Sequence, residues 1–486
     1  MAHVVVMVTS SYPRFPGDGV GSFMEPIAKG VAARGHEVHL VAPWHPAITR
    51  GKAEDGVYFH FFHYAPVPSL NVFGYASGLR ADTDVRSAAW IVAPLALAAG
   101  AFKAWRVAAK KRATVMHGHW VVPGGVMANT ARGSLPLVVS VHGSDVYLAE
   151  RRATVGRAAR RVFRGAARVT ACSDDLRARS IALGADAART ETVPYGVDSA
   201  RFAPSSEARA ATRRALGFGD APIVFTAGRL VRKKGFEYLI DAAGRLAADT
   251  PSLRVVIAGD GDLRNELGER ARTSGAGKIV TFLGAQPQDE IARLMAAADV
   301  IAVPSVKDDA GNVDGLPNFA LEAMASATPI VSTTAGGLAQ VMSDGVTARV
   351  VGERDAAALA RAISGVLAQP DAGRRLGAAA RVRVEQDFGW ARVAERFEIY
   401  ACGVELANGF GELTNAAEQR RRFTQAMDEK VRRYGERYPL DEDFLDAVAK
   451  MPDASGVALG FDRLVMLASG ALRVDQVVWT PPAGEA

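Results

Sequence analysis

The sequence predicts an α/β fold in which two Rossmann-like domains face each other across a cleft. Short valine-rich runs typical of strands alternate with helical patterns, and this alternation stops at "TVPYGVDSARFAP" (192–204) before it restarts. Strands that are apolar on both faces are typical of parallel sheets covered by helices. Two such sets therefore indicate two domains, and ligands bind such sheets at the carboxyl ends of the strands.

The predicted strands fall into two sets. The first set is "HVVVMVT", "EVHLVAP", "VYFHFFHY", "TVMHGH", "LVVSVHG" and "RVTACS". The second set is "PIVFTAG", "LRVVIAG", "KIVTFLG", "VIAVPS" and "PIVSTT". We predict an N-terminal domain over 1–192, a linker over 193–204, a second domain over 205–392 and a distinct final segment over 393–486.

The composition indicates a soluble globular protein with an anionic partner. Hydrophobic residues make up 49% and charged residues 23% of the 486 positions. The net charge of +6 favours phosphates, nucleic acid or anionic lipid. Two cysteines, Cys172 and Cys402, give no disulfide framework, and we expect no secretion signal, so the reducing cytoplasm is the expected compartment. The longest apolar run (88–102) contains Pro94 and is too short to span a bilayer comfortably.

A basic segment follows the first strand of the second domain. Arg229 and Lys234 in "RLVRKKGF" (229–236) come soon enough after this strand to point into the cleft. A guanidinium and an ammonium placed there suit a diphosphate. A solvated basic turn is the alternative.

A second candidate segment is "VDGLPNFALEAMA" (313–325). Pro317 fits the first turn of a helix, and the free amides at that helix start can hold a phosphate. Asp314 lies just before the helix and Glu322 in its second turn, where each carboxylate can accept hydrogen bonds from sugar hydroxyls. The alternative is an acidic loop followed by one glutamate on a helix surface.

The first domain offers two weaker signals. Gly19 and Gly21 lie in "SSYPRFPGDGVGSF" (10–23) and allow a ligand to approach the backbone closely, although a flexible loop is an equal alternative. The loop departs from the GxGxxG fingerprint, which argues against a nicotinamide enzyme. His142 ends the fifth strand and is expected at the cleft floor, either as a structural or as a catalytic residue.

Seven segments together resemble the family-4 retaining glycosyltransferases of the GT-B fold over about residues 1–400. They are "GVGSF", "VHGSD", "VPYGVD", "GRLVRKKGFEYLI", "VIAGDGDL", "VTFLGAQPQDEIARLMAAADVIAVPS" and "DGLPNFALEAMASATPIVST". The resemblance implies a nucleotide-sugar donor as substrate, no cofactor, no nucleic-acid partner, and a lipid-linked or polysaccharide acceptor. It implies hexosyl transfer with retention and without a metal, in glycolipid or surface polysaccharide synthesis.

The resemblance also implies roles for individual residues. Arg229 and Lys234 would neutralise the donor diphosphate, and Glu322 would hold the ribose. Asp314 would bind donor-sugar hydroxyls, in a position where the family more commonly has Glu. His142 would lie beside the donor sugar. The loop with Gly19 and Gly21 would approach the donor phosphate and the acceptor. The remaining implied donor-binding positions are Gly315, Leu316, Pro317 and Asn318.

Two patterns raise the alternative of a metal site. "DTD" (82–84) is a DxD triplet, but it stands before a helical stretch and is interpreted as a helix start. His117 and His119 could share one face of a strand, yet the sequence places no third ligand beside them, so a structural role is favoured.

Two basic segments raise the question of membrane contact. The segment 150–169 holds seven arginines, and "FKAWRVAAKKRA" (102–113) is also basic. Basic helices with apolar opposite faces could rest on an anionic inner leaflet, which would make the protein peripheral to the membrane. A solvated helix face is the alternative.

The final segment resembles the C-terminal part of class II lysyl-tRNA synthetases and of elongation factor P lysine ligases. "GVALGFDRL" (456–464) matches the third class II motif, in which Arg463 would bind the ATP phosphates. In "ELANGFGEL" (405–413), Glu405, Asn408 and Glu412 would bind lysine or ATP-bound metal. The second motif should lie upstream, where transferase sequence stands instead, so we predict no lysine activation. The alternative function is a lysine-ligase remnant on an idle transferase scaffold.

Overall fold

The structure is a computed structural model of the 486-residue chain. It describes residues 2–65, 71, 73–75, 79–80, 84–85, 87–390, 397–401, 404–411, 417, 419–421, 423–424, 427–428, 431, 442–450 and 455–459. Two compact units divide at Trp390/Ala391. The first unit contains two α/β lobes, which we name the first lobe (2–192) and the second lobe (205–387).

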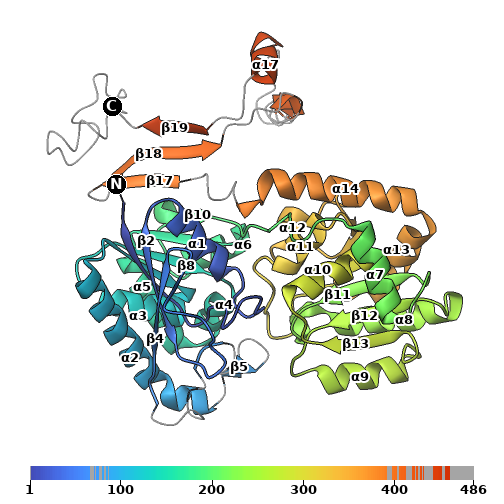
Figure 1. Cartoon of the computed structure of the whole chain (residues 1–486), viewed down its shortest axis with the longest axis horizontal. Helices are drawn as coiled ribbons and strands as arrows, with labels where there is room; N and C mark the ends of the chain where they lie inside the picture. Colours follow the sequence, from blue (N-terminus) through green and yellow to red (C-terminus); the bar gives the residue numbers. More distant parts are fainter. Residues whose placement is uncertain are drawn as a thin grey trace. The chain divides into compact units, whose positions relative to one another are not determined.

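The first lobe is built on an eight-stranded sheet in the order β10-β9-β8-β7-β1-β2-β4-β3 (Figure 1). Neighbouring strands are parallel, except that β3 is antiparallel to β4. The strands are β1 (Val4–Val8), β2 (Glu37–Pro43), β3 (Ala53–Glu54), β4 (Val57–Phe62), β7 (Val115–His119), β8 (Leu137–Val141), β9 (Arg168–Ala171) and β10 (Thr190–Thr192). The helices are α1 (Met24–Ala33), α2 (Ser87–Lys111), α3 (Val126–Ala131), α4 (Ser144–Arg151), α5 (Ala153–Gly165) and α6 (Asp174–Ala182).

Helices cover both faces of this sheet because its strands are apolar on both faces. In β1, Val6 and Val8 pack in the core that contains residues of α2, α3 and α5. Val5 and Met7, on the other face, pack in the core that contains residues of α1. The valine-rich runs of the sequence therefore indicate the correct sheet type.

The second lobe has a six-stranded, fully parallel sheet in the order β13-β12-β11-β14-β15-β16. Its strands are β11 (Ile223–Ala227), β12 (Arg254–Ala258), β13 (Val280–Gly284), β14 (Val300–Val303), β15 (Ile330–Ser332) and β16 (Arg349–Val350). Its helices are α7 (Ser206–Leu216), α8 (Phe236–Asp249), α9 (Arg264–Thr273), α10 (Gln288–Ala297), α11 (Asn318–Ala325), α12 (Leu338–Val341), α13 (Ala356–Ala368) and α14 (Pro370–Asp387). The predicted pair of Rossmann-like domains is confirmed.

The segment between the lobes is fixed to the end of the first unit. The amide of Val197 donates to the carbonyl of Phe388 at 2.8 Å. Gly196 lies against the ring of Trp390, so closely that a methyl group there would overlap the indole. The chain thus returns from α14 to the linker before the first unit ends.

Helix α2 corrects two expectations. It continues to Lys111, and its 22-residue part Trp90–Lys111 is long and apolar enough to cross a membrane by length and composition, a test that core helices also pass. One of its faces packs into the core of the first lobe. It begins at Ser87, not at the DxD triplet. Only Asp84 of that triplet lies within the described residues, in the two-stranded sheet of β5 (Leu79–Arg80) and β6 (Asp84–Val85).

Helix α5 corrects the membrane hypothesis for the segment 150–169. Its apolar side chains, among them Val155, Val162 and Phe163, are buried in the first lobe. Its exposed positions are its arginines together with Ala153 and Thr154 at its start, so its large apolar side chains are not free to insert into a leaflet.

The second unit contains the synthetase-like segment. β17 (Phe397–Ala401), β18 (Val404–Gly411) and β19 (Ser455–Leu459) form an antiparallel sheet with β18 in the centre, and α17 (Glu442–Ala449) precedes β19. The predicted α+β character of this segment is confirmed. Glu405 and Asn408 lie in β18, whereas Glu412 and Arg463 lie outside the described residues.

Candidate functional site

The basic turn of the second lobe follows β11, and its conformation requires glycine at position 235. Lys234 lies in a short 3-10 turn (Arg232–Lys234) directly before α8. Gly235 follows with φ +65°, and a methyl group there would overlap the carbonyl of Pro304. Arg229 follows the end of β11 at Ala227 by two residues, and its side chain is exposed. The two predicted cations therefore stand at the carboxyl end of the same strand.

Asp314 is joined to two lysines of this turn. Its Oδ2 lies 2.8 Å from Nζ of Lys234, and its Oδ1 lies 3.0 Å from Nζ of Lys233. Ser305 Oγ is 3.4 Å from the same Oδ2. Burial raises the pKa of Asp314, but the two ammonium groups outweigh burial and hold that pKa well below its ordinary value. Asp314 is therefore ionised throughout the physiological pH range.

Glu322 lies in the second turn of α11, on the next part of the same segment. Burial raises the pKa of Glu322 to about 7, and the nearby charges of Lys234 and Arg201 oppose this shift. Near neutral pH this carboxyl group is therefore divided between its two protonation states. Pro317 is the N-cap of α11 and stands one position before its predicted place in the first turn.

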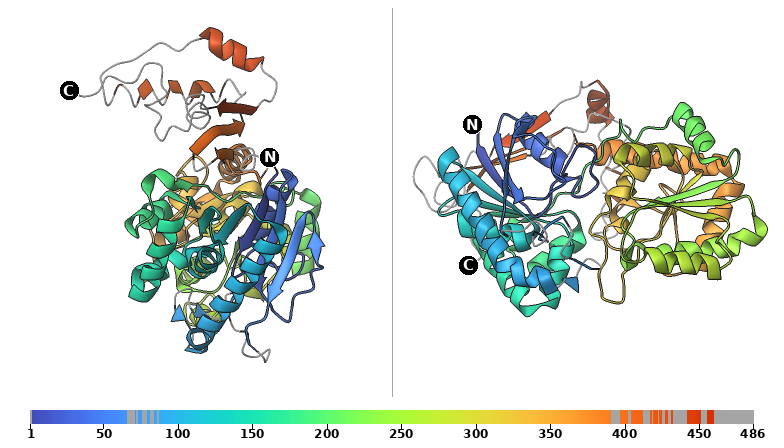
Figure 2. Two further views of the ribbon diagram at one scale, coloured as in Figure 1. Left: turned by 90° about the vertical axis from the view of Figure 1, so that its left-hand side faces the viewer. Right: turned by 60° about the horizontal axis from the view of Figure 1, so that its bottom comes forward.

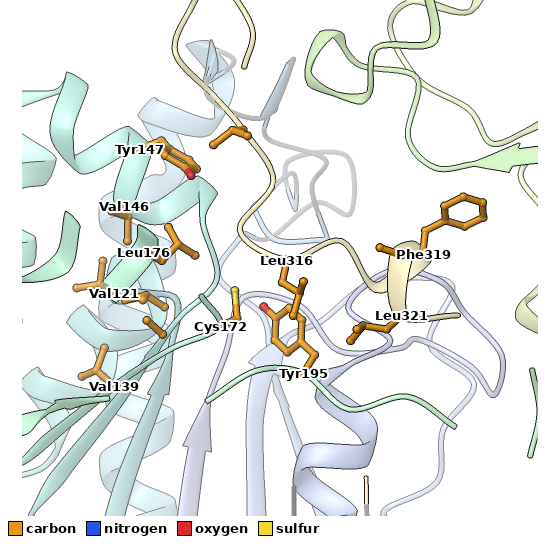
Figure 3. Packing of buried hydrophobic residues seen from close by; sticks show 14 of the residues in the cluster. Val121, Val139, Val146, Tyr147, Cys172, Leu176, Tyr195, Leu316, Phe319 and Leu321 are labelled. Atoms are coloured by element: carbon orange, nitrogen blue, oxygen red, sulfur yellow. The ribbon is translucent and has the colours of Figure 1, made fainter. Parts of the chain in front are cut away.

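The loop that carries Asp314 reaches across to the first lobe. A methyl group on Gly315 would lie 2.5 Å from a methyl carbon of Leu176 and 3.0 Å from the sulfur of Cys172. Leu316 belongs to the same buried cluster, beside Cys172 and Tyr195 (Figure 3). The ends of β8 and β9 and the Asp314 loop are therefore in direct contact.

Gly336 and Gly337 pack closely against the backbone of the Asp314 loop. The amide of Gly337 donates to the carbonyl of Asp314 at 3.2 Å. A methyl group on Gly337 would overlap the carbonyl oxygen of Gly315, and one on Gly336 would overlap that of Asp314. Only glycine allows the backbones to approach this closely, a requirement that sequence reasoning missed.

His142 stands directly after β8, as predicted, and its backbone is held by a buried carboxylate. Asp145 accepts the amides of His142 at 3.2 Å, of Gly143 at 3.0 Å and of Val121 at 2.7 Å. Burial lowers the pKa of His142 to about 3, with a smaller contribution from His117. The imidazole is therefore neutral near pH 7 and only a weak base.

The glycine loop ends beside His142. Gly21 has φ +68°, whereas a side chain at Gly19 would meet no atom within 4 Å, so only Gly21 needs to be glycine for conformational reasons. Asp18 braces the loop, and its carboxylate accepts Nε of Arg14 at 2.6 Å. Phe23, the last loop residue, lies with its ring 4.8 Å from that of His142.

The two histidines on β7, His117 and His119, pack against each other inside the first lobe. The rings of His117 and His119 are 4.0 Å apart, and Nε2 of His117 lies 2.8 Å from the hydroxyl of Ser140. Across the described parts of the chain, no three His, Cys, Asp or Glu side chains are grouped closely enough to hold a metal ion.

The structure thus brings together most of the predicted site. Lys234 and Asp314 are in contact, Glu322 is within electrostatic reach of Lys234, and Gly315 touches the end of the first-lobe strands near His142. Sequence reasoning missed Lys233, although "RKK" contains it, because the direction of each lysine depends on the short turn.

Two α/β lobes built on largely parallel sheets, with a lysine–acid cluster near the strand ends of the second lobe, are the arrangement of a nucleotide-sugar transferase of the GT-B class. The chain belongs to this glycosyltransferase family. Residues 208–383 match the model of glycosyl transferases group 1, and residues 18–196 match the glycosyl transferase 4-like domain. This confirms the predicted glycosyltransferase activity with a nucleotide-sugar donor.

Curated relatives span most of this chain. A GDP-mannose-dependent alpha-(1-6)-phosphatidylinositol monomannoside mannosyltransferase of Mycolicibacterium smegmatis is 31% identical over 400 residues, which is 80% of this chain and 97% of the relative. A glycogen synthase of Mycobacterium tuberculosis is 28% identical over 80% of this chain and 92% of its own length.

Solved structures show the same fold. The Anabaena protein HepE in complex with UDP covers 80% of this chain and 97% of its own, with a TM-score of 0.64 and 22% identity. A sucrose-phosphate synthase of Thermosynechococcus elongatus covers 81% and 96%, with a TM-score of 0.65 and 22% identity.

The final segment matches a different family. Residues 378–483 match the class II tRNA synthetases (D, K and N). An elongation factor P–(R)-beta-lysine ligase of Salmonella arizonae is 58% identical over 88 residues, which is 18% of this chain and 27% of the ligase. The predicted fusion of a transferase with a synthetase-type fragment is confirmed, and this chain spans about a quarter of that relative.

Proposed function

We propose that this chain transfers a mannosyl group from GDP-mannose, with retention of configuration, to a lipid-linked acceptor. The observation that carries the proposal is the cluster of Lys233, Lys234 and Asp314, with Glu322 on the following helix. The choice of donor and acceptor is supported by the mycobacterial relatives, which are GDP-mannose-dependent enzymes for a phosphatidylinositol monomannoside. A surface polysaccharide is the other acceptor that the sequence leaves open.

The proposed chemistry follows from where charge develops. The acceptor oxygen bonds to the anomeric carbon while the bond from that carbon to the phosphate oxygen breaks. The acceptor proton passes to the departing diphosphate on the same face of the sugar. Lys234 and Arg229 stabilise the negative charge of that diphosphate. His142, with its low pKa, is a poor general base for an inverting attack from the opposite face.

The proposal is tested with a panel of GDP-, UDP- and dTDP-sugars and a phosphatidylinositol-linked acceptor. We expect GDP-mannose to be consumed fastest and the product to carry an α-mannosyl linkage by NMR. A β-linked product would contradict retention, and turnover of no donor at all would contradict the function. Lysine-dependent ATP–pyrophosphate exchange is the matched negative assay, and we expect it to stay at background because the tail spans 27% of the ligase.

We further propose that α2 rests on the cytoplasmic face of an anionic membrane, which would make the protein peripheral. Ile91, Leu95, Phe102 and Trp105 are between 53% and 77% exposed. Their spacings of four, seven and three residues place them on one stripe, opposite the buried face of α2. The helix lies on the outside of the first lobe (Figure 2).

Charge on α2 supports a lipid surface as the occupant of this stripe. Arg106 and Lys110 are exposed on the same helix, and the rings of Phe102 and Trp105 pack 5.8 Å apart. Aromatic rings beside cations are typical of helices that lie in the interface of anionic bilayers.

Vesicle sedimentation measures this contact. We expect the wild type to sediment with vesicles that contain phosphatidylglycerol, less so at high salt, and the double variant Phe102→Ser/Trp105→Ser to lose about tenfold in partitioning. The control is Val346→Ser/Val382→Ser, two exposed valines of the second lobe. Equal binding by both variants, or no binding by the wild type, would refute the surface.

A further inference from the structure

Tyr195 lies at the point where the two lobes and the linker meet, and sequence reasoning treated it only as part of the linker. Its side chain is buried, and its hydroxyl oxygen is 2.7 Å from Nδ1 of His142. The other ring nitrogen of His142, Nε2, lies 3.2 Å from Nδ1 of His119. Tyr195 and His119 thus hold both nitrogens of the His142 ring, whichever tautomer is present.

Aromatic side chains also pack around the His142 ring. Phe23 is stacked on Tyr195 with ring centroids 4.6 Å apart and also lies 4.8 Å from His142. The ring of Trp120 is 4.6 Å from that of His142. The orientation of His142 therefore depends on Phe23 from the glycine loop, on Trp120 directly after β7 and on Tyr195 from the linker. Tyr195 contacts both Phe23 and His142.

Tyr195 also contacts the donor side of the site. Figure 3 shows its ring beside Leu316, with its hydroxyl oxygen toward Cys172. Leu316 follows Asp314 and Gly315 in the loop of the second lobe. Two residues further along the chain, the amide of Val197 is hydrogen-bonded to the carbonyl of Phe388, directly after α14. One side chain thus connects the linker, the His142 ring and the Asp314 loop.

We propose that Tyr195 is a positioning residue for sugar transfer, because its hydroxyl holds the His142 imidazole in the orientation that faces the donor sugar. This role rests on the transferase activity and on a place for His142 beside the donor. It does not depend on which sugar or nucleotide the donor carries. A hydroxyl that only filled the core would have no effect on the reaction beyond its effect on stability.

Tyr195→Phe tests the proposal, since it keeps the ring stacked on Phe23 and removes the hydroxyl alone. We expect kcat to fall about tenfold, because a His142 ring held by one hydrogen bond fewer is less often in the orientation that the transition state needs, with the donor KM changed less than about twofold. Two-bond ¹⁵N–¹H NMR correlations of the imidazole should show changed shifts for Nδ1 of His142. Donor hydrolysis, with whichever donor the wild type uses, serves as the assay.

The matched control is Tyr64→Phe, which removes a hydroxyl near the backbone of Phe73 in the same lobe. We expect its kcat to remain at the wild-type value. An unchanged kcat or unchanged His142 shifts in Tyr195→Phe would overturn the proposal. A wild type that turns over no donor would instead refute the proposed function, so the two failures are distinguishable.

Discussion

Replacing Lys234 by alanine is expected to lower kcat/KM for sugar transfer by about 10²–10³-fold. The ammonium is placed to meet the negative charge that grows on the departing diphosphate, and loss of one such preorganised contact typically costs this much. In the structure this ammonium is 2.8 Å from Asp314, and Lys233 holds the other oxygen of the same carboxylate. Lys233 can therefore keep Asp314 paired when Lys234 binds the donor.

The control for this prediction is Arg232→Ala. Arg232 lies in the same turn, but its guanidinium pairs with Glu266 on α9 at 2.6 Å and 2.7 Å. We expect Arg232→Ala to keep most of the wild-type activity. Lys234→Arg should be more active than Lys234→Ala because it keeps the positive charge. Steady-state kinetics with a folded Lys234→Ala protein that retained more than a third of the wild-type kcat/KM would contradict the assignment.

Glu322→Gln is expected to weaken donor binding about 10- to 100-fold at pH 8, the worth of one or two hydrogen bonds to a charged group. The pKa of Glu322 is raised to about 7, so the wild-type carboxylate should lose its charge as the pH falls from 8 to 6. Donor affinity of the wild type should fall over that window. The variant has no charge to lose, and its affinity should stay nearly constant.

The same substitution should have the opposite effect on stability. Because the folded state binds a proton that the unfolded state releases near pH 4.5, Glu322 makes the wild type less stable as the pH rises from about 4.5 through 7. Glu322→Gln removes this penalty, so its free energy of unfolding at pH 8 should exceed that of the wild type.

Calorimetric titration with GDP-mannose and denaturant unfolding measure both effects. Glu207→Gln, an exposed first-turn residue of α7, is the control and should change neither. A variant that bound the donor as tightly as the wild type at pH 8 would show that this carboxylate does not contact the nucleotide.

The sequence allowed the two lobes to be predicted, and also the positions of Lys234 and of Asp314 near strand ends, because local patterns indicate both. Runs of valine indicate strands of a parallel sheet. A residue that directly follows a strand lies at the carboxyl end of that strand. Lys234 and Asp314, which lie 80 positions apart, were therefore both expected at the strand ends, and the structure adds that their side chains are hydrogen-bonded. The contact of Lys233 with Asp314 could not be predicted in this way, since it depends on a three-residue turn.

The helices α2 and α5 have similar sequence patterns but differ in which of their apolar side chains are buried. Both α5 and α2 are basic segments with apolar faces, but the apolar face of α5 is in the core, while α2 is apolar on its buried side and again on its exposed stripe. Sequence periodicity shows that an apolar face exists and not what covers it. Tyr195 was missed for the same reason, because its role comes from three segments that are distant in the sequence.

The most direct test of the central claim is a crystal structure of this chain with a nucleotide-sugar donor. We expect the diphosphate beside Lys234 and Arg229, the ribose hydroxyls on Glu322 and the sugar between Asp314 and His142. A donor bound elsewhere, with Lys234 still paired to Asp314 and no phosphate near it, would show that this cluster is not the donor site.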